Sequence, residues 1–191
     1  MPIRLMISLA LVLLAIGGVA AETAMDTNPA KSSQGDLKIA VIGHGSVMFT
    51  HDGKTIHVDP WSKQGDYSKL PKADLILITH EHQDHLDLDA ISKIMKADTK
   101  IVINPKCSEK LPNATVMKNG DIVSFAGLQV EAVPAYNIVH KRDNGQPFHP
   151  KGSGNGYVIT FGAKRVYVAG DTENIPEMKA LKNIDVAFLP M

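Results

Sequence analysis

The chain has 191 residues, of which 44% are apolar and 21% charged, the composition of an ordinary globular domain with one core. Lysine plus arginine and aspartate plus glutamate each number 20, and a neutral chain of this kind is a poor candidate for binding nucleic acid or an acidic membrane surface. The single cysteine excludes an internal disulfide framework and a metal site built from several cysteines.

Residues 1–21 have the pattern of a secretory signal peptide. Arg4 supplies a positive charge, residues 5–16 form an apolar run broken only by Ser8, and Val19 and Ala21 stand at positions −3 and −1 of a cleavage site. A membrane anchor is the alternative, but the apolar run is shorter than the roughly 20 residues that span a bilayer. We therefore expect cleavage, no stable membrane insertion, and a mature protein that is periplasmic or secreted.

The rest of the chain reads as a leader followed by one domain of alternating short elements. Residues 22–36 are polar and without periodicity, which predicts a flexible leader, and residues 37–191 form the domain. Strands are predicted over 37–42, 46–51, 54–59, 74–79, 100–103, 115–118, 122–125, 128–133, 156–161, 165–169 and 185–189. Helices are predicted over 86–95 and 176–181, and a long polar loop over 137–155. The fold class is therefore α/β or α+β around a mostly antiparallel sheet.

The strongest chemical signal is a cluster of four potential metal ligands where the apolar strand over 74–79 ends. Imidazole nitrogens and carboxylate oxygens are ligands that zinc accepts, and residues two apart in extended backbone point to the same side. The cluster consists of His80, His82, Asp84 and His85. A polar helix cap with solvated histidines is the alternative, but a cap needs one such residue rather than four. The pattern therefore favours a metal site.

A second signal follows the strand over 165–169. Asp171 comes directly after Gly170, which allows a close backbone approach, and a carboxylate at a strand end suits a position between two cations. On its own, Gly-Asp-Thr after a strand indicates only a turn. Together with the histidine cluster it predicts a second contribution to the same site.

From Leu37 to Met191 the sequence resembles the metallo-β-lactamase-fold hydrolase superfamily. The cluster matches the H-x-H-x-D-H signature, and Asp171 matches the bridging aspartate. Gly43-His44 and Val58-Asp59-Pro60 are similar to the branch that includes ascorbate-lactonase and phospholipase D-like members. The resemblance implies a four-layer αββα sandwich and two zinc ions at one edge, with Mn²⁺ or Fe²⁺ as other metals. It also implies hydrolysis by a metal-bound hydroxide. Asp84 would orient or deprotonate the water from which this hydroxide forms.

The resemblance also implies a third histidine on the first metal, and here the sequence departs from it. Asn137 stands where some relatives carry that histidine, which leaves His140 and His149 as candidates. We favour His149 because it precedes Pro150 in a segment of restricted geometry. A solvated loop histidine is the alternative for either residue.

Two functions follow from these patterns. The first is an exported zinc-dependent hydrolase that acts on a small-molecule ester, lactone or phosphodiester, with no nucleic-acid partner. The second is a catalytically impaired, metal-binding remnant, because the superfamily continues beyond the strand at 185–189 with further strands and a last histidine. On this interpretation the domain is truncated, and exposed sheet surface would favour self-association.

Two further residues each have two interpretations. His44 lies between two glycines and is read as a turn histidine more readily than as a residue lining a cleft. Asp59 is either a structural partner of the site or a strand end.

Overall fold

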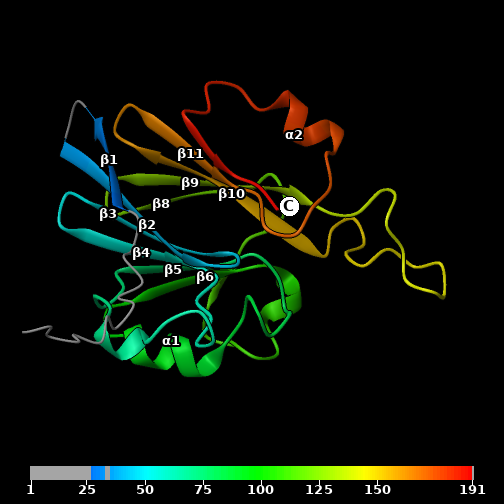
Figure 1. Ribbon diagram of the computed structural model, residues 1–191, viewed down its shortest axis with the longest axis horizontal. Coiled ribbons are helices and arrows are strands. Elements are labelled where there is room, and N and C mark those ends of the chain that lie inside the picture. The colour runs from blue at the N-terminus through cyan, green and yellow to red at the C-terminus, as the bar shows by residue number, and fades with distance from the viewer. Residues whose placement is uncertain (1–26, 33–34, 191) are drawn as a thin grey trace, which may run out of the picture.

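The computed structural model describes residues 27–32 and 35–190, and in this part of the chain two β-sheets lie face to face (Figure 1). The first sheet contains β1 (Thr27–Ser32), β2 (Gly35–Gly43), β3 (Ser46–His51), β4 (Lys54–Val58), β5 (Leu75–Ile78), β6 (Lys100–Ile103) and β7 (Thr115–Val116). The second contains β8 (Ile122–Phe125), β9 (Leu128–Ala135), β10 (Gly154–Phe161), β11 (Lys164–Val168) and β12 (Val186–Phe188). The α-helices α1 (Leu88–Ile94) and α2 (Pro176–Ala180) cover the outer faces, which gives the expected αββα layers.

The strand pairing is more mixed than the sequence predicted. The first sheet is antiparallel from β1 to β4 and parallel from β4 to β7, whereas the second is antiparallel apart from the parallel pair β11 and β12. Parallel neighbours need a crossover connection, and α1 lies in the crossover between β5 and β6. The 3₁₀ turns Tyr67–Lys69 and Pro105–Cys107 lie in the neighbouring connections.

The core is divided by β5, whose four residues are all buried. Leu75 and Leu77 pack in the layer between the two sheets, while Ile76 and Ile78 pack on the other face beside α1. Alternate side chains of a strand point to opposite faces, so a strand buried on both faces is apolar at every position, as its sequence predicted. This burial fixes the end of β5, from which the histidine cluster begins.

The helices are close to their predictions. Asp87 caps α1, its carboxylate accepting from the backbone N–H of Asp89 at 2.9 Å, and the helix ends one residue before Met95. On the second sheet, Met178 of α2 packs against a cluster that contains Tyr167. The connection between β9 and β10 is the predicted long loop, with one isolated bridge between Lys141 and Pro147.

The leader prediction needs a correction. Residues 1–26 with the predicted signal peptide lie outside the described residues, but Thr27–Ser32 forms β1, antiparallel to β2. Pairing through backbone groups requires no apolar pattern, so an edge strand of this kind leaves little trace in the sequence. None of the helices in the described residues is long and apolar enough to span a membrane.

Candidate metal centre

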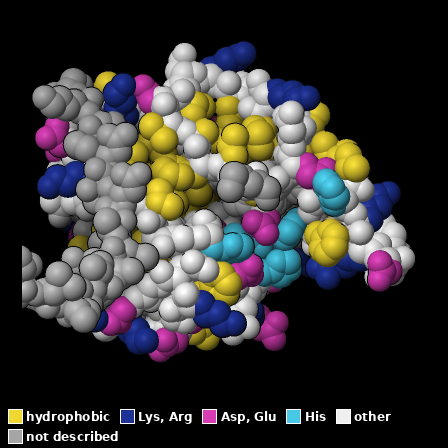
Figure 2. Space-filling model, in the orientation of Figure 1, with side chains coloured by type: hydrophobic (Ala, Val, Ile, Leu, Met, Phe, Trp, Pro, Cys, Tyr) yellow, Lys and Arg dark blue, Asp and Glu magenta, His cyan; other side chains and the backbone are white. Residues whose placement is uncertain are grey.

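The predicted ligands meet at one edge of the sandwich, where strands of both sheets end. His80 follows β5 of the first sheet, Asp171 follows β11 of the second, and His149 lies in the loop before β10. Figure 2 shows histidine side chains grouped with acidic ones on this face, beside a hydrophobic patch. The fold thus brings His149 to His82 across 67 positions of sequence.

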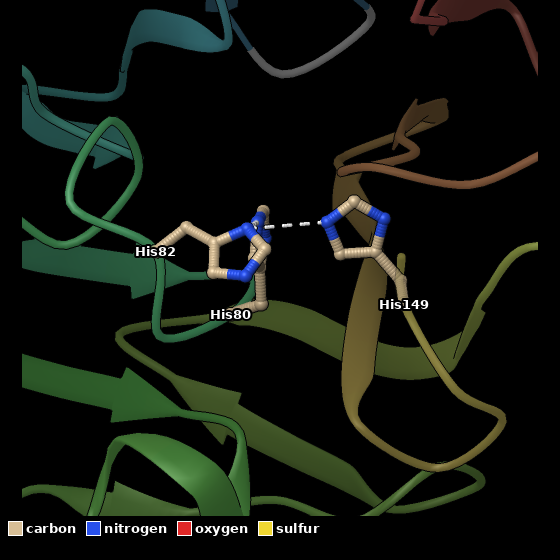
Figure 3. Close-up of side chains that lie close together, drawn as sticks. All are labelled: His80, His82 and His149. Carbon is tan, nitrogen blue, oxygen red and sulfur yellow. Dashed lines mark hydrogen bonds between the residues drawn. The ribbon is translucent and has the colours of Figure 1, made fainter. Parts of the chain in front are cut away.

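Three imidazole rings turn toward one another at this edge (Figure 3). His80 Nε2 lies 3.1 Å from His82 Nδ1, and His149 Nε2 lies 3.2 Å from the same nitrogen. The candidate ligand atoms of the three residues all lie within 4.8 Å of one another. Nitrogen lone pairs that converge in this way repel unless a proton or a cation lies between them, and zinc accepts such ligands.

The hydrogen bonds behind His80 determine which of its nitrogens faces the centre. The Thr79 hydroxyl donates to Asp59 Oδ2 at 2.6 Å and lies 3.0 Å from His80 Nδ1. A hydroxyl has one proton, so Thr79 can only accept from His80, whose Nδ1 therefore carries the hydrogen. The lone pair of His80 Nε2 is left for the centre.

Asp171 lies between two groups of ligands. Its Oδ2 is 3.5 Å from His149 Nε2 and 3.8 Å from His80 Nε2, whereas its Oδ1 is 3.3 Å from His85 Nε2. Each carboxylate oxygen thus faces a different set of imidazoles. This is the arrangement in which one carboxylate can be shared by two cations.

The second group consists of His44, Asp84 and His85. Asp84 Oδ2 lies 3.0 Å from His44 Nε2 and 3.9 Å from His85 Nε2. His85 Nε2 is buried and makes no hydrogen bond to the described residues. Leaving a buried nitrogen unpaired costs about 1–3 kcal/mol, so this orphaned atom, aimed at two carboxylates, fits a bound metal ion.

Asp59 supports His85 from behind. Its side chain is buried, lies 2.7 Å from His85 Nδ1 and accepts from the backbone N–H of Thr79 at 2.8 Å. Of the two interpretations left open for Asp59, the structure therefore shows the partner of the site. Gly45 lies against the same ring, because a Cβ added there would be 2.9 Å from His85 Cε1.

Burial and charge move the pKa values of the cluster in opposite directions. Burial lowers the pKa of His80 to about 2 and lowers that of His149, which keeps both imidazoles neutral and able to bind a metal. Burial also disfavours the charged form of His85, but the carboxylates of Asp59 and Asp171 outweigh it and raise its pKa to about 10. Although burial opposes ionisation of Asp171, the adjacent His85 holds its pKa well below the usual range.

The structure separates the two candidates for the third histidine. His149 lies among the cluster, whereas His140 is 76% exposed and its Nδ1 lies 2.7 Å from Glu173 Oε1. Backbone N–H groups of the loop hold the pKa of Glu173 well below its usual range.

A cavity of about 910 Å³ opens beside the cluster, and His44, His85, His140 and His149 all line it.

Sequence reasoning gave too little weight to residues that hold the cluster in place. His44 occupies a turn, with φ of 51°, as interpreted, but its side chain also contacts Asp84. Asn137 was noted only as a missing histidine, and Glu173 was not singled out at all. The signal that could have found it is a glutamate two residues after Asp171.

Comparison with known proteins shows the family to which the chain belongs. Residues 38–191 match the family described as "Beta-lactamase superfamily domain". A metal-dependent hydrolase of Thermus thermophilus is 32% identical over 164 residues, which cover 81% of this chain and 71% of the relative. A metal-dependent hydrolase of Anaeromyxobacter is 28% identical over 79% of this chain, and only 61% of that relative's length is covered.

Solved structures show the same fold. A crystal structure from Parabacteroides distasonis, provisionally assigned as a metal-dependent hydrolase, is 49% identical with a TM-score of 0.83, covering 87% of this chain and 76% of that one. A metallo hydrolase of Ignicoccus hospitalis is 26% identical with a TM-score of 0.61, covering 81% and 70% of the two chains. These matches confirm the family resemblance and the sandwich that the motifs predicted.

Proposed function

This chain belongs to the beta-lactamase superfamily, and on that premise we propose that it is a metal-dependent hydrolase of small esters, lactones or phosphodiesters. The observation that carries the proposal is the convergence of His149 and Asp171 on the His80–His85 segment, where His85 Nε2 is buried and has no hydrogen bond to any residue that the structure describes. These residues come from three separate segments, and imidazole and carboxylate groups gathered in this way are the donor set that holds cations in proteins. A cation would take the place of the proton that His85 otherwise carries between the carboxylates of Asp59 and Asp171.

The proposed ligand assignment follows the two groups. His80, His82 and His149 would hold the first ion, Asp84 and His85 would hold the second, and Asp171 would contribute to both. When bound, such ions activate water at neutral pH and polarise the bond to be cleaved. Imidazole and carboxylate ligands suit zinc, which we propose as the native metal, while Mn²⁺ and Fe²⁺ also accept them.

The chain's own residues have three tasks in this proposal. Asp84 accepts and orients a proton of the attacking water, and His44, 3.0 Å from Asp84 Oδ2, fixes that carboxylate. Asp59 holds the His85 ring in place. The adjacent cavity of about 910 Å³ has the size of a site for a small molecule. The net charge of zero likewise favours a small-molecule substrate over nucleic acid.

We also propose that the protein is exported. The support is the pattern of residues 1–21, with its charged start, apolar run and small residues before the cleavage position. Amino-terminal sequencing of the protein recovered from its natural host tests this directly. A new amino terminus at Glu22 in an extracytoplasmic fraction is expected, and an intact Met1 in the cytoplasm would contradict export.

The hydrolase proposal is tested with the purified chain and a His80→Ala/His82→Ala variant. Metal content is measured on both, and both are assayed on panels of esters, lactones and phosphodiesters. We expect about two zinc ions in the wild type, a marked loss of metal in the variant, and turnover of one panel by the wild type alone. Equal metal content in both proteins would overturn the ligand assignment. Metal binding without any turnover would favour the catalytically impaired alternative.

A further inference from the structure

Asn137 stands where the sequence led us to look for a histidine, and it lies directly against the histidine that takes that place. Its Oδ1 accepts from the backbone N–H of His149 at 2.9 Å and lies 2.7 Å from His149 Nδ1. In return, the backbone N–H of Asn137 donates to the carbonyl of His149 at 2.9 Å. The two residues are therefore tied together by main chain and side chain at once.

The orientation of the Asn137 amide is determined by partners that cannot exchange roles. A backbone N–H can only donate, so the atom facing His149 N must be the amide oxygen. The amide nitrogen faces Glu173 Oε1 at 3.1 Å, and an ionised carboxylate can only accept. The partners of the oxygen and of the nitrogen independently require the same orientation of the Asn137 side chain, so the positions of its oxygen and nitrogen are assigned without ambiguity.

This orientation decides the tautomer of His149. Because Asn137 Oδ1 is an acceptor, the His149 Nδ1 beside it must carry the hydrogen. The neutral ring then has its lone pair on Nε2, the nitrogen that lies 3.2 Å from His82 Nδ1 and 3.5 Å from Asp171 Oδ2. The amide thus presents the metal-binding form of the ring before any ion arrives.

Glu173 anchors this arrangement to the strand end that carries Asp171. Its Oε1 accepts from the Asn137 side chain and from the backbone N–H of His140 at 2.8 Å. Its Oε2 accepts from the backbone N–H groups of Ile138 at 2.8 Å and Val139 at 2.6 Å. One carboxylate therefore holds the beginning of the loop that bears His149, two residues after the shared aspartate.

We propose that Asn137 and Glu173 are positioning residues that select the tautomer of His149 and fix its loop, so that the first metal position is assembled across two segments. The effect on metal affinity rests on the proposed function, whereas the tautomer of His149 follows from the hydrogen bonds alone. Partners of metal-binding histidines commonly contribute about 10–100-fold to metal affinity. We expect losses of that size at the first position, with the second position much less affected.

The experiment compares Asn137→Ala with Asn144→Ala, an exposed asparagine of the same loop, and Glu173→Gln with Glu109→Gln, an exposed glutamate. Zinc affinity and stoichiometry are measured by competition with a chromophoric chelator. The protonated nitrogen of His149 is identified by ¹⁵N NMR of the metal-free protein, with a His149→Gln sample for assignment. We expect Asn137→Ala to bind the ion at the first position about 10–100-fold more weakly and to shift the hydrogen of His149 toward Nε2. Glu173→Gln should weaken the same position. Both controls should behave as the wild type.

A conservative variant separates positioning from general stability. Asn137→Asp keeps an acceptor opposite His149, so it should retain the Nδ1–H tautomer while losing the contact with Glu173. Wild-type affinity at both positions in Asn137→Ala would overturn the inference, as would an Nε2–H tautomer in the wild type, which needs no variant to fold. If the wild type binds no divalent ion, the proposed function fails, whereas the NMR result still decides the role of Asn137.

Discussion

The carboxylate of Asp59 lies 2.7 Å from Nδ1 of His85, with both side chains buried and 26 positions apart in the sequence. Asp59 has a φ of 45°, a left-handed conformation that is uncommon for a residue other than glycine. Its bonds to Thr79 hold it there, at the end of β4. The proposed second metal position therefore depends on a neighbouring strand end as well as on the histidine cluster itself.

Replacing Asp59 by asparagine should destabilise the metal-free protein. The pKa of His85 is raised from 6.5 to about 10, so the pair's contribution to stability is complete below about pH 6.5 and is lost as the pH rises toward 10. Removing one partner of a buried pair costs roughly 3–5 kcal/mol. Urea unfolding in the presence of a chelator should show that loss at pH 7, and a flatter profile above pH 6.5 in the variant. Asp98→Asn, at an exposed site, is the control, and equal stabilities of Asp59→Asn and wild type would contradict the role of the pair.

Replacing each of the two loop histidines by alanine, in separate variants, distinguishes the candidates for the third ligand. His149→Ala should lose the first metal ion, because His149 Nε2 faces His82 and Asp171, whereas His140→Ala should keep both ions. Elemental analysis after dialysis against dilute zinc measures this. Metal loss in His140→Ala but not in His149→Ala would show that the loop rearranges when the ion binds.

A side chain at Gly45 should disturb the second metal position. The added Cβ of Gly45→Ala would lie 2.9 Å from His85 Cε1, which is closer than real Cβ contacts, so the ring must move. We expect lower occupancy of the second position with the first retained. Gly65→Ala is the matched control, since its Cβ would meet only the side chain of Ile42 at 3.0 Å. Thermal unfolding followed by circular dichroism confirms that both variants fold, and full occupancy in folded Gly45→Ala would argue against the packing described.

Acid should destabilise the fold through His57, away from the metal centre. Burial lowers the pKa of His57 to about 4, against a hydrogen bond with the Pro71 carbonyl that raises it. The unfolded chain binds the proton more readily, so stability is complete above about pH 6.5 and falls as the pH drops toward 4, by about 3 kcal/mol in total. His57→Gln removes that titration and should show a shallower loss in urea unfolding of metal-free protein over this range. His140→Gln serves as the control, and parallel profiles of wild type and His57→Gln would contradict the expectation.

Removing the metal should lower the melting temperature of the wild type. Ions that bind only the folded chain stabilise it by mass action, and their removal leaves the three converging nitrogens of His80, His82 and His149 without a cation. Melting with and without a chelator measures the shift, which readdition of zinc should reverse. The His80→Ala/His82→Ala variant should show a much smaller shift, and an unchanged melting temperature in the wild type would count against a tightly held ion.

The sequence by itself determined the local features of this protein. The apolar run over 74–79 and the four ligands that follow it predicted a buried strand ending in a metal-binding segment, because a strand's period and a motif's spacing are properties of neighbouring residues. The same reasoning located α1, the hairpin of β10 and β11, and the aspartate after β11. The edge strand β1 escaped it, because backbone pairing leaves no pattern of side chains.

Only the tertiary structure decided how distant segments combine at the centre. His140 and His149 are both loop histidines in the sequence, and the fold brings His149 to His82 while turning His140 onto Glu173. Asp59, Asn137 and His44 gained their positions in the same way, through contacts across strand ends and long loops. These contacts join residues that are far apart in the sequence. Which of them meet is determined by how the two sheets pack against each other, and not by the local conformational preferences of the chain.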